Sequence, residues 1–228
     1  MPNLTYSAVV DGLEEIEPLR PYKLIDNMPK WFKDMPMDIH GNVTARGCPS
    51  FVDLFRSAYV FPAWCDMEFT FFPQEDRWEY AGPTNFFDLS IEHADQQLLD
   101  HIPTKNYFKI LKPSSPWMLK TDPGISILQV QYPFDFQQDF TVWPGVTHND
   151  VYYETNVQMF IHKKSDEPFG VSIKRGQPLA LHVPFRREEE PWTAEYDNEG
   201  QHKLNVSHLY SHTKFKNSYR NLTKGFIK

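Results

Sequence analysis

Hydrophobic and polar residues alternate most regularly between Ile125 and Tyr132. The residues of this segment divide into two alternating sets: Ser126, Leu128, Val130 and Tyr132 against Ile125, Ile127, Gln129 and Gln131. A period of two residues predicts a β-strand whose two faces differ. The preceding Asp122-Pro123-Gly124 predicts a type II turn, because proline presets φ and glycine supplies the positive φ that this turn requires.

Similar alternation, or short apolar runs bounded by glycine and proline, predicts most of the remaining elements. The expected strands are 64–73, 77–81, 108–111, 117–120, 140–142, 151–162, 171–173 and 179–185. We expect 77–81 to pair antiparallel with 64–73, because turn residues separate them. A spacing of roughly ten residues between strands is typical of a β-sandwich or a barrel.

Helical spacing is confined to a few short segments. Apolar residues share one face over 48–60, where Ser50 is a candidate N-cap, and a second helix is predicted over 90–102. A short helix is also expected near 27–34, and an amphipathic one in the basic C-terminal segment 207–228. The proline-rich residues 1–47 predict an extended N-terminal arm, followed by a single β-sandwich domain over 48–228 that ends in a helix.

The composition favours the same fold class. Aromatic residues make up 15% of the 228-residue chain, and there are 19 prolines against 10 glycines. Aromatic side chains favour strands, whereas frequent proline interrupts helices and marks edges and turns. We therefore predict a mainly β protein with few and short helices.

Charge and cysteine content restrict the class of partner. A net charge of −7 argues against nucleic acid and against an anionic membrane surface, and no window approaches 18 apolar residues. Cys48 and Cys65 form no CxxC pair, so a cysteine-bound zinc site is not expected and a reduced, cytoplasmic protein is the simplest interpretation. The partner classes that remain are a small molecule and another protein.

Four ordered segments resemble an uncharacterised family of bacterial and tailed-phage proteins. These segments are Cys48-Pro49, PWMLKTDPGIS at 116–126, PGVTHNDVYYETN at 144–156 and GQPLALHVPFRRE at 176–188. Two positions depart from the family pattern: Asp122 stands where proline is usual, and Thr147-His148-Asn149 stand near the usual Asp-Thr. The resemblance implies a jelly-roll or cupin-like β-sandwich in the bacterial cytoplasm, or in the host cytoplasm if a phage encodes the protein. It implies no catalytic residues.

One constellation could carry metal chemistry. His148 and Asp150 lie two positions apart at an expected strand start, and His182 lies in the later strand 179–185. A His-x-Asp pair with a distant second histidine is the facial triad of non-haem Fe(II) oxygenases. Arg186 or its neighbour Arg187 would then pair with the carboxylate of a co-substrate such as 2-oxoglutarate. His-Asn-Asp is equally ordinary turn chemistry before a strand.

Three functional hypotheses follow. The first is an accessory protein whose β-sandwich binds a small molecule or a protein partner. The second is a 2-oxoglutarate-type oxygenase that holds Fe(II) on His148, Asp150 and His182, with Arg186 on the co-substrate. The third is a structural component of a virion, because jelly rolls are common in capsid proteins.

Overall fold

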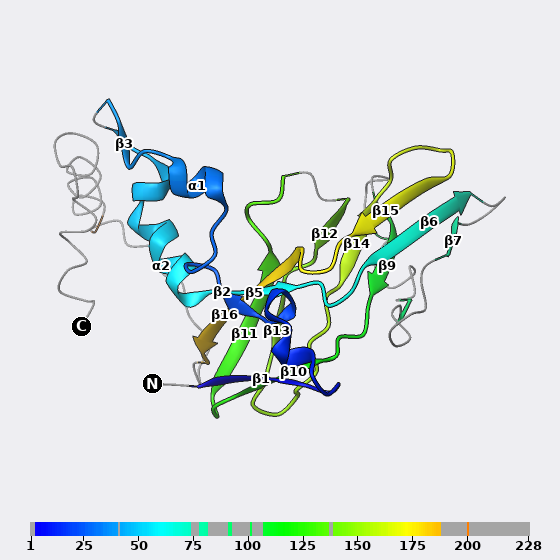
Figure 1. Cartoon of the computed structure of the whole chain (residues 1–228), viewed down its shortest axis with the longest axis horizontal. Coiled ribbons are helices and arrows are strands. Elements are labelled where there is room, and N and C mark those ends of the chain that lie inside the picture. Colours follow the sequence, from blue (N-terminus) through cyan, green and yellow to red (C-terminus); the bar gives the residue numbers. More distant parts are fainter. Residues whose placement is uncertain are drawn as a thin grey trace. The chain divides into compact units, whose positions relative to one another are not determined.

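A computed structural model of the chain describes residues 3–40, 42–73, 78–81, 91–92, 101, 107–136, 139–187 and 200. The chain divides into two compact units. The first unit comprises Met1–Asp26 and Ser57–Arg187, and the second comprises Asn27–Arg56 and Glu188–Lys228. Figure 1 shows the labelled helices and strands of the two units.

The largest sheet of the first unit has five strands, ordered β13-β11-β16-β5-β2. Their bounds are Gly145–Thr147 (β13), Ile125–Gln131 (β11), Pro178–Arg186 (β16), Tyr59–Pro62 (β5) and Tyr22–Lys23 (β2). The long strands β11 and β16 run antiparallel side by side in Figure 1, and Gln129 stands opposite His182 in their register. This pairing fixes which side chains of the two strands can meet.

Three smaller sheets complete the described part of this unit, and all their pairings are antiparallel. One sheet has the order β12 (Phe140–Val142), β14 (Met159–His162), β9 (Tyr107–Lys112) and β8 (Ile91–Glu92). Another has the order β15 (Phe169–Ile173), β6 (Met67–Pro73) and β7 (Trp78–Ala81). The last pairs β1 (Leu4–Ala8) with β10 (Trp117–Thr121). Two 3₁₀ turns, η1 (Leu13–Glu15) and η2 (Glu17–Leu19), follow β1.

A single hydrophobic cluster joins these sheets. It takes Phe61 from β5, Phe71 from β6, Leu111 from β9 and Trp117 from β10, all of them fully or almost fully buried. In β10 the buried positions alternate with more exposed ones, as the period of a strand requires. The core of the first unit therefore lies between sheets that pair segments distant in sequence.

The second unit holds short elements around a smaller aromatic group. These elements are α1 (Lys30–Asp34), β3 (Asp38–Ile39), β4 (Asn42–Val43), the 3₁₀ turn η3 (Ala45–Gly47) and α2 (Pro49–Ser57). Phe32 of α1 meets Phe55 of α2 edge-on with ring centroids 5.4 Å apart, and Phe51 stacks on Phe55 one turn earlier. Arg46 donates a hydrogen bond to the carbonyl oxygen of Met35 at 2.7 Å.

The predicted mainly β class is confirmed, with antiparallel sheets and few, short helices. The predicted turn before β11 is also present. Gly124 has a φ of 78°, and the Ile125 N–H donates to the carbonyl oxygen of Asp122 at 3.1 Å, as in a type II turn. The expected pairing of 77–81 with the preceding strand is found as β6 with β7.

Several predicted elements differ from those observed. The helix expected over 48–60 ends at Ser57, because the apolar residues from Tyr59 to Pro62 pair in the five-stranded sheet. The helix predicted over 90–102 is wrong at Ile91–Glu92, which form a strand against β9. The strand predicted over 151–162 begins only at Met159, and Val151 is 76% exposed.

Other expectations are not tested. Residues 93–100 and the predicted C-terminal helix lie outside the described residues. The arm over 1–47 and the domain over 48–228 stay predictions, although Leu4–Ala8 pair with β10. No helix in the described part of the chain is long and apolar enough to span a membrane.

Candidate functional site

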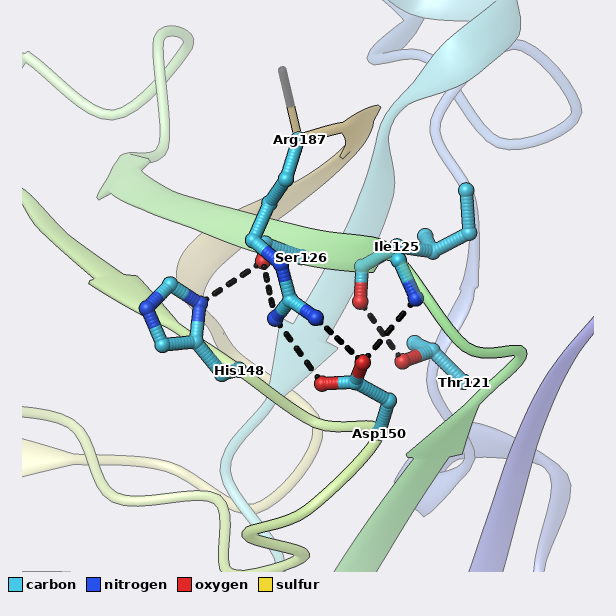
Figure 2. A network of polar contacts seen from close by, with 7 residues as sticks. Thr121, Ile125, Ser126, His148, Asp150 and Arg187 are labelled. Carbon is cyan, nitrogen blue, oxygen red and sulfur yellow. Dashed lines mark hydrogen bonds and ion pairs between the residues drawn. The ribbon is translucent and has the colours of Figure 1, made fainter. Parts of the chain in front are cut away.

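Asp150 lies at the centre of a polar network beside the start of β11 (Figure 2). Its carboxylate accepts two hydrogen bonds from the guanidinium of Arg187, one of them Nη1 to Oδ1 at 2.9 Å. The Gly124 N–H, at the turn before β11, donates to Oδ2 at 2.9 Å. These hydrogen bonds, with that from Arg187 the strongest, lower the pKa of Asp150 to about 2. The carboxylate is therefore charged, and both of its oxygen atoms accept hydrogen bonds from other groups of the protein.

Ser126 extends this network toward His148. The Ser126 Oγ atom accepts a hydrogen bond from Arg187 Nη1 at 3.1 Å and lies 2.8 Å from Nδ1 of His148. Ser126 is completely buried, whereas His148 is exposed. We call Ser126, His148, Asp150 and Arg187 the Asp150 network. A hydroxyl that solvent cannot reach is placed to hold its neighbours rather than to attack a substrate.

His182 belongs to a second, separate group of contacts. Its Nδ1 atom lies 3.0 Å from the hydroxyl of Tyr6 and its Nε2 atom 3.2 Å from Oε1 of Gln129. The ring stacks on Phe61 with centroids 4.9 Å apart. Because Oε1 can only accept, Nε2 carries the proton and Nδ1 accepts the Tyr6 hydroxyl. Burial lowers the pKa of His182 to about 4, so the ring is neutral at pH 7.

The predicted metal ligands are divided between these two groups. Ser126, which holds His148, and Gln129, which holds His182, are three positions apart on β11, so their side chains point to opposite faces. Within the described residues, no group of three or more His, Cys, Asp or Glu side chains could hold a metal ion. The structure therefore does not bring the three predicted Fe(II) ligands together, and the oxygenase hypothesis has no support from this geometry.

The two neighbouring arginines at the end of β16 differ in environment. Arg186, the residue predicted to bind a co-substrate, is exposed and stands opposite Ile125 in the strand register. Arg187 is the one that binds a carboxylate, and that carboxylate is Asp150. The Arg187 N–H also donates to the carbonyl oxygen of Gly124 at 2.9 Å. The arginine-carboxylate pairing expected for a ligand is thus made within the protein.

A different part of the first unit offers an open pocket of about 420 Å³. Four segments form it: the loop and 3₁₀ turns after β1, the connection between β5 and β6, the residue before β10, and the loop between β15 and β16. Leu19 and Trp64, which are 2% and 4% exposed, provide buried apolar lining. We call this cavity the Trp64 pocket, and its remaining lining residues are Val10, Asp11, Gly12, Leu13, Ile16, Cys65, Asp66, Pro116 and Arg175.

The charged residues of the Trp64 pocket are Asp11, Asp66 and Arg175, and all three are exposed. Asp66 is held in place, because its Oδ1 atom accepts the backbone N–H of Arg175 at 2.8 Å. Burial raises the pKa of Cys65, another lining residue, to about 11, and the negative charge of Asp66 contributes to this rise.

Two glycines shape the loops that carry these charges. Gly12 has a φ of 82° and precedes η1, and Gly176 has a φ of 83° in the loop before β16. A Cβ atom at Gly176 would lie 3.3 Å from the carbonyl oxygen of Pro18. The Gly176 N–H donates to the carbonyl oxygen of Ala63 at 2.8 Å, which fixes the loop next to Trp64. Only glycine adopts such a backbone without strain.

No pattern in the sequence predicted the residues of this pocket. The available signal was weak: Asp11-Gly12 and Arg175-Gly176 are charged residues placed directly before a glycine, and glycine marks turns. Binding residues are often found on such loops. Nothing in the sequence indicated that these two loops, more than 160 positions apart, line one cavity.

No family model matches the chain, and no curated protein matches it. Among solved structures, a variant of the dUTPase of phage phi11 of S. aureus is similar with a TM-score of 0.39 and 9% identity, covering 86% of this chain and 99% of that chain. A variant of the dUTPase of Staphylococcus bacteriophage 80alpha has a TM-score of 0.38 and 8% identity, with coverage of 86% and 99%. At these TM-scores and identities the likeness assigns neither a family nor an activity to this chain.

Proposed function

We propose that this chain is a small-molecule-binding β protein and that the Trp64 pocket is its binding site. It would then be the accessory protein of the first hypothesis, whose β-sandwich binds a small molecule. The observation that carries the proposal is the pocket itself, with its volume of about 420 Å³ and its apolar lining. Small-molecule sites typically enclose roughly 300–1,000 Å³, with mainly apolar walls and a few polar groups.

The residues of the pocket support this proposal in chemical terms. Ile16, which is 43% exposed, and the half-buried Val10 and Leu13 offer apolar area whose burial would drive association. Leu19 and Trp64 form the buried apolar wall beneath them. Asp11, Asp66 and Arg175 provide polar groups that would orient a ligand. By contrast, the polar atoms of the Asp150 network already bind one another. The pocket is therefore the better candidate.

Cys65 provides a direct test, because it lines the pocket while Cys48 does not. Purified protein is labelled with iodoacetamide at pH 9 in the presence of indole, tryptamine, indole-3-propionate or L-tryptophan, and the two cysteines are quantified by peptide mass spectrometry. We expect at least one compound to slow labelling of Cys65 several-fold while labelling of Cys48 is unchanged. Cys48 thus serves as a reference within the same chain.

A pocket-filling variant completes the test. Ile16 lines the pocket and is 43% exposed, so Ile16→Trp adds volume at the pocket without replacing a core side chain. We expect this variant to lose the protection of Cys65. Val9→Trp is the matched control, because Val9 is 54% exposed and does not line the pocket. If none of the four compounds protects Cys65 in the unmodified protein, or if protection survives Ile16→Trp, the proposed site is wrong.

A further inference from the structure

The Trp64 pocket contains opposite charges that do not neutralise each other. Asp11 and Arg175 both line it, yet no ion pair joins them, and their charged groups form no ion pair or hydrogen bond with any other described residue. Asp66 also lines the pocket, and its contact with Arg175 is to the backbone N–H, which leaves the guanidinium unused. The pocket thus presents carboxylates and a guanidinium that remain available to a ligand.

A ligand with one charge would satisfy only one side of this arrangement. An anion would pair with Arg175 but would meet the carboxylates of Asp11 and Asp66, and a cation would meet the opposite conflict. A molecule that carries both charges could pair with both sides. Guanidinium and carboxylate form strong bidentate hydrogen bonds, and ammonium pairs well with aspartate.

The remaining lining defines the rest of the ligand. Val10, Leu13, Leu19, Trp64 and Pro116 supply apolar surface to the same cavity as the charges. A ligand that fits therefore joins an apolar body to a compact zwitterionic head. A free α-amino acid with an aromatic or large aliphatic side chain has this construction.

We infer that the Trp64 pocket binds a zwitterionic amino acid with an apolar side chain, its carboxylate at Arg175 and its ammonium group at Asp11 and Asp66. This inference rests on the proposed function, because it names the ligand class of the same pocket. The head group would lie where the charges are exposed and the side chain against the buried Leu19 and Trp64.

The test uses a matched set of ligands and isothermal titration calorimetry on the full chain. L-Tryptophan carries both charges, tryptamine lacks the carboxylate, indole-3-propionate lacks the ammonium group, and indole lacks both. Hydrogen bonds to charged groups at a partly exposed site contribute modestly, so we expect L-tryptophan to bind roughly 3–10-fold more tightly than either singly charged compound. Added salt should reduce this difference, because it screens exposed charges.

Two variants assign the charges to residues. Arg175→Gln should weaken binding of L-tryptophan and leave tryptamine unaffected or bound more tightly. Asp11→Asn should weaken L-tryptophan and leave indole-3-propionate unaffected or bound more tightly. Lys120→Gln is the control, because Lys120 is exposed on β10 and does not line the pocket.

The failure of this inference differs from the failure of the proposed function. If indole binds as tightly as L-tryptophan, or if Arg175→Gln and Asp11→Asn change no affinity, the pocket is a binding site but the zwitterionic class is wrong. If L-leucine and L-tryptophan both bind and both respond to the two variants, the class is supported. If none of the four indole compounds binds or protects Cys65, both proposals are wrong.

Discussion

The two polar groups beside β11 each contain a histidine but differ in charge. In the Asp150 network, on the Ser126 face, a charged carboxylate and a guanidinium neutralise each other, with the Asp150 side chain 8% and the Arg187 side chain 32% exposed. On the Gln129 face, His182 is 3% exposed and neutral, and its ring nitrogens bind only uncharged groups. A buried carboxylate keeps its charge where a guanidinium faces it, whereas a buried ring whose partners are all uncharged stays neutral.

This contrast also explains why neither group is the better ligand site. In both, the strong donors and acceptors bind other groups of the protein. The Trp64 pocket differs, because the charged groups of Asp11 and Arg175 form no ion pair or hydrogen bond with another described residue. This difference in hydrogen bonding is the reason for proposing the pocket, rather than either polar group, as the ligand site.

The largest expected effect comes from removing the buried ring. His182→Ala leaves a cavity beside Phe61 and removes the hydrogen-bond partner of the Tyr6 hydroxyl, so we expect a loss of about 4 kcal/mol in the free energy of unfolding. Urea unfolding followed by circular dichroism measures it. The matched control His148→Ala changes an exposed histidine and should cost less than about 1 kcal/mol. Equal losses at the two positions would contradict the contrast.

The second prediction concerns pH. The pKa of His182 is about 4 in the folded protein against 6.5 for a free histidine, so the unfolded chain binds more protons between these values. The contribution of His182 to the free energy of unfolding is therefore fully present above pH 6.5. It declines as the pH falls toward 4, by about 3 kcal/mol in total. Urea unfolding at several pH values between 7 and 4 measures the slope.

The control for this pH dependence is His182→Gln, which cannot titrate. The variant should lose the part of the slope between pH 6.5 and 4 that His182 provides. It should keep the decline between pH 3.8 and about 2, where this aspartate takes up a proton in the unfolded chain while the folded Asp150 stays charged beside Arg187. An unchanged slope above pH 4 in the variant would show that His182 is not buried as a neutral ring.

The smallest of the three effects is expected at the exposed end of β16. Arg187→Met removes the partner of the Asp150 carboxylate and the donor to the buried Ser126 hydroxyl, and we expect a fall of a few degrees in Tm. Arg186→Met is the control, because Arg186 is exposed and its replacement should leave Tm nearly unchanged. Differential scanning fluorimetry separates the two, and equal shifts would remove the special role of Arg187.

Local patterns in the sequence were sufficient for many of the strands. The strand over 125–131, the turn at Gly124 and the hairpin of β6 with β7 follow from alternation and turn residues, which act over a few positions. The pattern failed at Ile91–Glu92, where pairing with β9 replaced a predicted helix. It also failed before Met159: Val151 is 76% exposed, and the described pairing of this segment is an isolated bridge between Glu154 and Met118.

The candidate sites were less predictable than the strands. His148, Asp150 and His182 were identified as a set from spacing alone, and their types and strand positions were compatible with a shared metal. The register of β11 with β16 placed His182 opposite Gln129, whereas His148 reached Ser126 on the other face. A shift of three positions along a strand reverses the face, and sequence spacing between strands does not reveal it.

By itself, the sequence determined the mainly β class and the conformation of short segments, because alternation and turn propensity are properties of neighbouring residues. Only the tertiary structure decided which polar groups meet. It pairs Asp150 with Arg187 and buries His182 beside Tyr6. It also brings the loops of Asp11 and Arg175 to one cavity. These outcomes depend on strand register and on contacts between distant segments, which no local pattern of residues records.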